Sequence, residues 1–489
     1  MIGLESQITT LRRLQPMRIT GRVAALRGLT VLVRDLPLPV GSLVMVQRDG
    51  HLPSTRAASC ESIASTMRGA EGLGEIIGFD NAYTIVMMLA NPSGIRSGDP
   101  VVGLHATQTV GVCDAMLGRV VNGLGMPIDG KGSIDGAYPR PIDPEPLGPL
   151  SRRRITEPVY TGVRAIDIFT TLGRGQRMGI FAGPGVGKST LLGAVARNAT
   201  ADVSVVGLIG ERGREVRDFI EHNLGEEGLK RCVVVVATGD ESAALRVRAA
   251  MVSCAVAEHF RDEGKSVMLI MDSVTRFAHA QRQIGLSVGE PPAMRGYTPS
   301  VFAAMARLLE RAGAVETTNT AEASTITGGS ITGLYSVLVE GDDMTEPVAD
   351  AARGILDGHL ILSRALAQRA HYPAIDILDS VSRVADEVTD GAHQAARRQL
   401  VRLMAAYKQV EDLVQIGAYA KGSSAEADMA IDYQPRITEL LQQNLGDVVG
   451  KAGTQGAFDT CRARVVNMAI EVGSELQRLS KARPSPRRT

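Results

Sequence analysis

The chain has 489 residues, which is too long for one compact core, so we expect two to four domains. Apolar residues make up 44 % of the sequence, and this fraction excludes an intrinsically disordered chain. Lys and Arg together number 53, as do Asp and Glu, so the net charge indicates neither a nucleic-acid partner nor an anionic membrane.

Other features of the composition favour a soluble cytoplasmic protein. Trp is absent and aromatic residues make up only 3 %, which disfavours base stacking as the main activity; no nucleic-acid partner is expected. The five cysteines form no Cys-x-x-Cys pair, as is typical of reduced thiols in the cytoplasm. No apolar run reaches the roughly 20 residues of a membrane-spanning helix, and the first residues lack the apolar core of a signal peptide.

Residues 1–16 have the pattern of a short amphipathic helix. Leu4, Ile8, Leu11 and Leu14 recur at helical spacing. Such a helix either packs on its own protein or docks on a partner or a membrane surface, and the pattern does not decide between the two.

Residues 17–105 are predicted to form a small β-barrel domain. Short β-rich runs such as LTVLVRDL, YTIVMML and DPVVGL follow one another, most of them separated by Gly, Pro, Asn or Asp. The Pro-rich stretch 135–153 is interpreted as a loop or linker.

Residues 106–390 are predicted to form an α/β domain. Near-continuous apolar runs mark strands that are buried on both faces of a mainly parallel sheet. These runs are 178–182, 203–210, 232–239, 266–272 and 333–341. Residues 391–480 have a largely helical pattern, and residues 481–489 are expected to be a disordered basic tail.

The stretch AGPGVGKST has the pattern of a phosphate-binding loop between a strand and a helix. Its glycines let backbone N–H groups turn toward phosphate oxygens, and the following helix adds its positive end. Lys188 would reach the β- and γ-phosphates, and Ser189 would ligate Mg²⁺. The predicted nucleotide-binding residues of this loop are Ala182, Gly183, Pro184, Gly185, Val186, Gly187, Lys188, Ser189 and Thr190.

Hydrolysis needs two further carboxylates, and the sequence offers one candidate for each. Asp272 closes an apolar strand, where it could hold Mg²⁺, although a buried strand that ends in Asp can also be structural. Glu211 follows another strand, where it could orient the attacking water. The alternative for Glu211 is a solvated ion pair with Arg212.

Longer blocks resemble the rotary and secretion ATPase superfamily. They are GLIGERGREVRDFI (207–220), residues 271–302, residues 328–367 and YPAIDILDSVSRV (372–384). The resemblance is strongest to the flagellar export ATPase and its virulence type III secretion relatives. QIGAYAKGS (415–423) favours the flagellar member over the catalytic subunit of ATP synthase.

This resemblance implies a RecA-like core, ATP and Mg²⁺ as cofactors, and roles for particular residues. Glu211 corresponds to the catalytic glutamate, with Arg212 beside it, and Asp272 to the magnesium-shell aspartate. Tyr372 is similar to the tyrosine that stacks on adenine. Arg383 resembles the arginine finger that enters the neighbouring subunit's site.

The resemblance also implies partners and a function. Because one chain carries both Glu211 and Arg383, a homohexamer could complete all its own sites. Expected partners are a stator-like regulator at residues 1–16, and an export gate and chaperone–cargo complexes at the C-terminal domain. The implied function is ATP hydrolysis that energises flagellar protein export, preparing or unfolding subunits at the cytoplasmic face of the inner membrane, with peripheral membrane association.

Four alternatives stay open from the sequence. The chain could serve virulence secretion, or be the catalytic subunit of an ion-driven ATP synthase. It could be a hexameric RNA helicase or termination factor, although the barrel runs show few aromatic and basic RNA-binding elements. It could also bind nucleotide without hydrolysing it, which the presence of Lys188, Glu211 and Arg383 disfavours.

Overall fold

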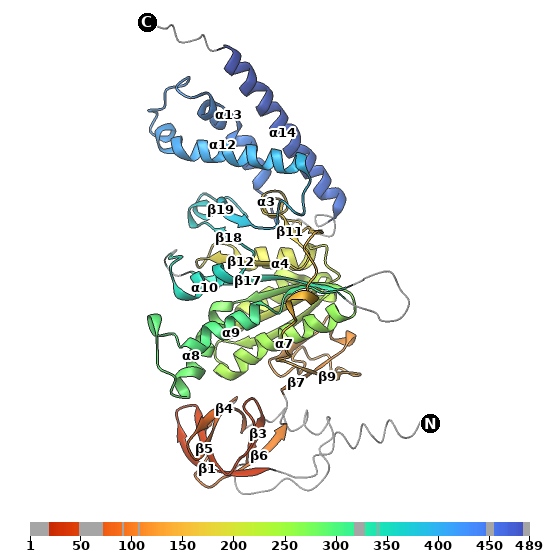
Figure 1. Cartoon of the computed structure of the whole chain (residues 1–489), viewed down its shortest axis with the longest axis vertical. Coiled ribbons are helices and arrows are strands. Elements are labelled where there is room, and N and C mark those ends of the chain that lie inside the picture. Colours follow the sequence, from red (N-terminus) through yellow and green to blue (C-terminus); the bar gives the residue numbers. More distant parts are fainter. Residues whose placement is uncertain are drawn as a thin grey trace, which may run out of the picture.

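The computed structural model describes residues 19–47, 72–89, 92–105, 108–316, 328–339, 341, 343–445 and 454–482. These residues form three units along the long axis of the molecule (Figure 1). A β-barrel lies at one end, a sheet with helices on both faces lies in the middle, and a group of helices lies at the other end. The helix predicted for residues 1–16 lies outside the described residues.

The N-terminal unit is a closed six-stranded barrel, which confirms the prediction of a small barrel. Apolar side chains such as Val31, Val44 and Val86 fill its interior. Around the barrel the strands run β1 (Thr20–Arg27), β2 (Thr30–Arg34), β5 (Tyr83–Met88), β4 (Leu73–Asp80), β3 (Leu43–Val46) and β6 (Pro100–His105).

The middle unit is built on a mainly parallel sheet, as the apolar runs predicted. Its strand order is β19-β18-β12-β17-β15-β13-β14-β8, and β19 is antiparallel to β18. The strands are β8 (Val120–Asn122), β12 (Arg177–Ala182), β13 (Val203–Glu211), β14 (Cys232–Thr238), β15 (Ser266–Asp272), β17 (Ser330–Leu338), β18 (Gly358–Leu362) and β19 (Ile375–Ser382), with β16 (Gly313–Ala314) paired to β17.

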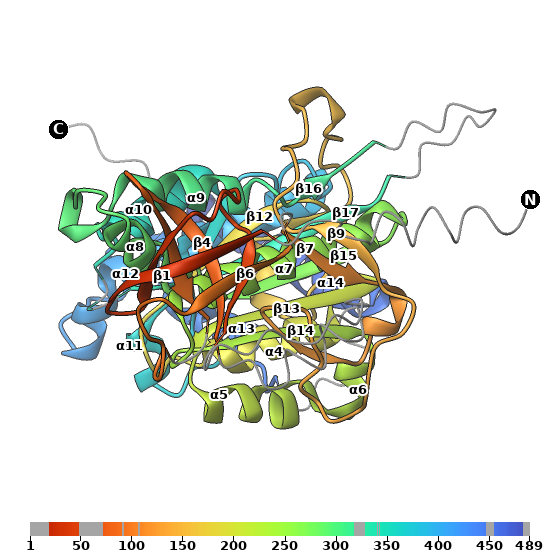
Figure 2. The same cartoon turned by 90° about the horizontal axis from the view of Figure 1, so that it is seen from below.

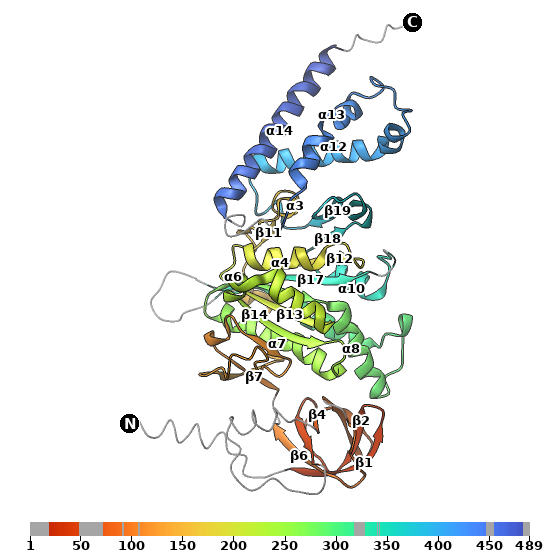
Figure 3. The same ribbon diagram turned by 180° about the vertical axis from the view of Figure 1, so that it is seen from behind.

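Helices bury both faces of this sheet, which explains why its strands are apolar throughout. Alternate residues of one strand belong to different cores: Val206 and Leu208 pack with helix α4 (Lys188–Asn198), and Val205 and Ile209 pack with helix α7 (Ala243–Asp262). The face with α4 lies toward the C-terminal helices and the face with α7 toward the barrel (Figure 3).

Further elements flank the sheet. They are α3 (Arg164–Phe169), α5 (Gly213–Asp218), η4 (Phe219–Leu224), α6 (Gly225–Lys230), α8 (Val274–Ser287), η5 (Met294–Gly296), α9 (Pro299–Leu309), α10 (Pro347–Ile355), α11 (Arg364–Gln368), η3 (Pro149–Ser151) and the strand pair β10 (Pro158–Val159) and β11 (Leu172–Gly173).

The barrel packs on α7 and α8. Leu43, Leu73 and Met87 of the barrel belong to one apolar cluster with Ala280 of α8, and Figure 2 shows this end of the molecule.

The interpretation of residues 135–153 as a loop or linker is wrong for its first part. Strand β9 (Tyr138–Pro141) pairs antiparallel with β7 (Thr109–Val112). Ile142 N–H donates to Gln108 O at 2.9 Å, so Pro139 and Pro141 occupy the alternate positions whose nitrogens face away from β7. Proline is tolerated there because no ladder donor is lost.

The C-terminal unit consists of α12 (Gly391–Gln415), α13 (Ala425–Leu441) and α14 (Gln455–Ala482). Helix α14 packs through Phe458, which stacks on Tyr160 with 4.1 Å between ring centroids. The helix extends to Ala482, so residues 481 and 482 are helical and do not belong to a disordered tail, which was predicted for 481–489. Residues 483–489 lie outside the described part of the chain. Among the described residues, no helix is both long and apolar enough to span a membrane.

Candidate active site

The glycine-rich loop connects β12 directly to α4. Ala182 ends the strand and Lys188 begins the helix, as the loop pattern predicts. Gly185 and Gly187 have φ angles of 78° and 88°, in the left-handed region that favours glycine. Ser189 and Thr190 lie exposed in the first turn of α4, where the positive end of the helix favours an anion.

Three charged side chains converge at the carboxyl edge of the sheet. Lys188 Nζ lies 2.5 Å from Asp272 Oδ1 and 3.8 Å from Glu211 Oε1. Asp272 ends β15 and Glu211 ends β13, and these two strands are neighbours in the sheet. Parallel strands therefore deliver both carboxylates to the same lysine, as in open α/β sheets that bind ligands at this edge.

Asp272 is held from two sides. Its side chain is almost fully buried, and its Oδ1 accepts hydrogen bonds from Lys188 Nζ and, at 2.6 Å, from Ser336 Oγ. Ser336 lies on β17, the strand beside β15. A buried carboxylate with a charged partner and a hydroxyl donor stays in a fixed place, which a residue that organises a metal ion requires.

Glu211 lies in a different environment, although it is close by. Burial and the neighbouring charge of Asp272 raise the pKa of Glu211 to about 7, against the opposing effect of Lys188. Its Oε1 is buried and has no hydrogen-bond partner among the described residues. An acceptor that is aimed at the site and has no donor suits a group that orients a water molecule.

Arg212 does not form the ion pair with Glu211 that the alternative interpretation required. Its side chain is 82 % exposed, and its Nη1 lies 3.4 Å from Glu215. The structure therefore places Glu211 in the buried site and Arg212 on the surface beside it.

A cavity of about 670 Å³ adjoins the phosphate loop. Tyr372 forms part of its wall, and the Tyr372 ring lies 3.6 Å from the position that a Cβ on Gly187 would take. The volume suits a ligand the size of a nucleotide. The residues that line the cavity are Gly185, Val186, Gly187, Thr190, Leu191, Leu362, Ala370, Tyr372, Pro373, Ala374, Gln442, Gln443, Asn444 and Leu445.

The last four of these residues were missed by sequence reasoning. They follow α13, and Gln443 N–H donates to the carbonyl of Tyr372 at 2.9 Å. The Gln443 side chain is fixed in turn by Arg164 N–H, which donates to its Oε1, and by Gly162 O, which accepts from its Nε2. No local motif marks residues 442–445, because the tertiary fold alone brings them to the loop.

Arg383 lies away from the phosphate loop of its own chain. It directly follows β19, which runs antiparallel to β18. The first residue of β19, Ile375, pairs with Leu362, and its last residue, Ser382, pairs with Gly358. Leu362 pairs with Ala182 at the loop edge, and Arg383 N–H donates to Asp357 O, so Arg383 lies about 16 Å along the sheet from that edge. The structure brings together Lys188, Glu211 and Asp272, with Tyr372 at the loop, but not Arg383.

The fold and the site define a phosphate-loop nucleotide-binding protein. The ATP synthase alpha/beta family, nucleotide-binding domain, matches residues 162–382, and the T3SS EscN ATPase C-terminal domain matches residues 389–457.

Individual relatives narrow this class. The chain is 47 % identical to the flagellum-specific ATP synthase of Treponema pallidum over 433 residues, 88 % of this chain and 91 % of the relative. It is 51 % identical to the type 3 secretion system ATPase of Xanthomonas euvesicatoria over 369 residues, 76 % of this chain and 81 % of the relative. The chain belongs to the family of flagellar and type III secretion ATPases.

A solved structure agrees with this assignment. The structure of the assembled ATPase EscN from the enteropathogenic E. coli type III secretion system has 39 % sequence identity and a TM-score of 0.78. It covers 91 % of this chain and 100 % of its own.

We predict that Tyr372→Ala weakens nucleotide binding about fivefold, because an aromatic stacking partner is worth about 1 kcal/mol beyond its area. Tyr372→Phe keeps the ring and should bind as the wild type does. Equilibrium titration with a fluorescent ATP analogue measures both. Equal affinities of the Ala variant and the wild type would remove Tyr372 from the base-binding site.

Proposed function

We propose that the chain hydrolyses ATP with Mg²⁺ to energise protein export through a flagellar type III secretion apparatus. The observation that carries the catalytic part is the convergence of Lys188, Glu211 and Asp272 beside the phosphate loop. Membership of a family of export ATPases supports the physiological part.

Lys188 has a different partner when ATP is bound. In the structure its ammonium neutralises Asp272. The β- and γ-phosphates carry more negative charge than one carboxylate, so the lysine turns to them while the loop N–H groups and the start of α4 bind the same oxygens. The donors for the phosphates are therefore in place before the nucleotide arrives.

The residues present fit Mg²⁺, because the available donors are all hard oxygens. The Ser189 hydroxyl and the Asp272 carboxylate would hold the ion, with Asp272 acting on its water shell. When bound, Mg²⁺ neutralises charge on the β- and γ-phosphate oxygens. Asp272 would then remain charge-compensated by the ion as Lys188 turns to the phosphates.

Glu211 and Arg212 act on the terminal phosphate in this proposal. Glu211 accepts a hydrogen bond from the attacking water through its unpartnered Oε1. Arg212 leaves Glu215 and contacts the γ-phosphate. This change requires little energy, because an exposed ion pair is worth at most about 1 kcal/mol.

A homohexamer completes the site in this proposal, because Arg383 lies too far from the phosphate loop of its own chain to contact a nucleotide bound there. An arginine contributed by a neighbour stabilises the charge of the transition state and can be worth roughly 10³-fold or more in rate. The assembled form of the relative EscN supports a ring. A ring of identical chains supplies one Arg383 to each phosphate loop.

The remaining partners follow from the division of the chain. We divide it into a barrel at 17–105, a nucleotide domain at 106–390 and a helical domain at 391–480. The end of β6 at His105 and the start of α12 at Gly391 support this division. The stator-like regulator binds residues 1–16, and the export gate and chaperone–cargo complexes bind the helical domain at the cytoplasmic face of the inner membrane. The relative EscN has been solved with its central stalk EscO, which supports a ring that works around a stalk.

Flagellar export is favoured over virulence secretion. Flagellum-specific ATP synthases of Treponema pallidum, Pseudomonas aeruginosa and Bacillus subtilis are 47 %, 45 % and 48 % identical to the chain. Virulence secretion stays the second candidate, because the Xanthomonas type 3 secretion ATPase is 51 % identical over 369 residues.

Glu211→Gln should leave ATP binding near the wild-type level and lower steady-state turnover at least 100-fold, because the amide is a poor acceptor for the attacking water. Phosphate release and nucleotide affinity are measured on the same preparation. Glu221→Gln, an exposed carboxylate on η4, is the matched control and should keep full turnover. Wild-type hydrolysis by Glu211→Gln would refute the assignment of this residue.

Deleting the gene in its own host should abolish flagella and motility, and the wild-type gene should restore both. Lys188→Ala, which cannot hold the phosphates, should fail to restore them at an equal protein level. A motile deletion strain that no longer secretes virulence proteins would instead place the chain in the second system.

A further inference from the structure

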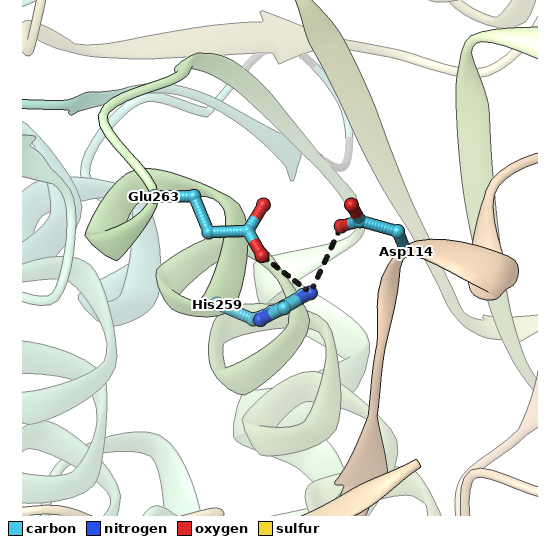
Figure 4. A group of neighbouring side chains, drawn as sticks. All are labelled: Asp114, His259 and Glu263. Carbon is cyan, nitrogen blue, oxygen red and sulfur yellow. Dashed lines mark ion pairs between the residues drawn. The ribbon is translucent and has the colours of Figure 1, made fainter. Parts of the chain in front are cut away.

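A second cluster of ionisable side chains lies at the opposite end of the sheet from the ATP site. His259 lies in the last turn of α7, Glu263 directly follows that helix, and Asp114 begins the short helix η2 (Asp114–Met116) (Figure 4). Nearby β15 begins at Ser266 and ends at Asp272, so the cluster lies about 20 Å from the magnesium-binding edge.

His259 is the unusual member of this cluster. Its side chain is 2 % exposed, and its Nδ1 lies 2.8 Å from the Tyr138 hydroxyl. Its other ring nitrogen, Nε2, is buried without a hydrogen-bond partner among the described residues. Figure 4 shows Nε2 directed between the carboxylates of Asp114 and Glu263. Leaving a buried polar atom without a partner costs about 1–3 kcal/mol, so this arrangement calls for a ligand.

The spacing matches that of ligands around one metal ion. Donors about 2.0–2.1 Å from a tetrahedral zinc ion lie about 3.4 Å from one another. His259 Nε2 lies 3.4 Å from Asp114 Oδ1 and 3.6 Å from Glu263 Oε1. All three donor atoms lie within 4.8 Å of one another, so binding requires only small side-chain shifts.

We propose that Asp114, His259 and Glu263 form a binding site for a divalent metal ion with the preferences of Zn²⁺. An imidazole nitrogen with two carboxylates selects zinc over magnesium, which prefers oxygen donors alone. Tyr138 provides the outer contact that fixes the ring, because Nδ1–H can donate to its hydroxyl oxygen and leave Nε2 free to bind metal.

The ammonium group of Lys265 neutralises the carboxylates of Asp114 and Glu263 when no metal is bound. Its Nζ lies 2.8 Å from Glu263 and 3.4 Å from Asp114. A divalent ion would replace this ammonium, which sits on a flexible and partly exposed side chain. The negative end of the α7 dipole favours a cation at the same place.

A metal ion at this site would link two segments that are far apart in the sequence. Asp114 belongs to the segment between β7 and β8 that enters the nucleotide domain after the barrel, and His259 and Glu263 belong to the end of α7. A bound zinc ion therefore joins this entry segment to the helix on which the barrel packs, and it stabilises the folded chain by mass action.

The test uses the full chain, stripped with a chelator and titrated with ZnCl₂ by calorimetry in excess Mg²⁺. The expected result is one zinc ion bound per chain and a higher melting temperature, reversed by the chelator. Asp114→Asn and His259→Gln should each weaken zinc binding at least tenfold. Asp114 is 63 % exposed at its side chain, so its variant tests the site even if His259→Gln fails to fold.

Three further variants distinguish zinc binding at this site from nonspecific zinc binding elsewhere on the protein. Lys265→Met removes the competing charge and should tighten zinc binding about tenfold. Asp262→Asn alters a neighbouring carboxylate outside the cluster, and Cys113→Ser removes the adjacent thiol; both should bind as the wild type does. Absence of zinc binding by the wild type, or unchanged binding by Asp114→Asn, would overturn the proposal.

Discussion

One ammonium group, that of Lys188, makes the arrangement of the ATP site possible. Asp272 and Glu211 end neighbouring parallel strands, so the sheet itself brings two carboxylates to one buried edge. Buried like charges repel and lose their hydration, and a nearby cation offsets part of both costs. Lys188 reaches both carboxylates from the first position of α4. The phosphate loop and the two carboxylates therefore form one electrostatic unit, and in the proposed mechanism Lys188 exchanges its carboxylate partner for the phosphates of the nucleotide.

The same sheet separates Arg383 from this unit. Because β19 runs antiparallel to β18, the residue that follows it emerges at the end of the sheet remote from the phosphate loop. One chain thus carries all the proposed catalytic groups but cannot bring them together. Under the proposed function, hydrolysis therefore depends on contact between chains, because each phosphate loop takes its arginine from a neighbouring chain.

The strands and the phosphate loop could be predicted because their signals are local. Buried strands are apolar throughout, and Gly185 and Gly187 fall where the chain needs left-handed angles. Gln443 could not be predicted, because it meets Tyr372 only through the folding of the C-terminal helices onto the nucleotide domain. Strand β9 was missed because prolines normally exclude strands, and only the register with β7 shows that their nitrogens face outward.

The central claim is that every working site combines two chains, and mixing two inactive variants tests it most directly. Lys188→Ala keeps Arg383, and Arg383→Ala keeps the phosphate loop, so each variant alone should form rings without activity. Rings assembled from an equal mixture should regain hydrolysis, because roughly a quarter of random interfaces then pair an intact loop with an intact arginine. A mixture as inactive as its components, although shown to form mixed rings, would contradict the account.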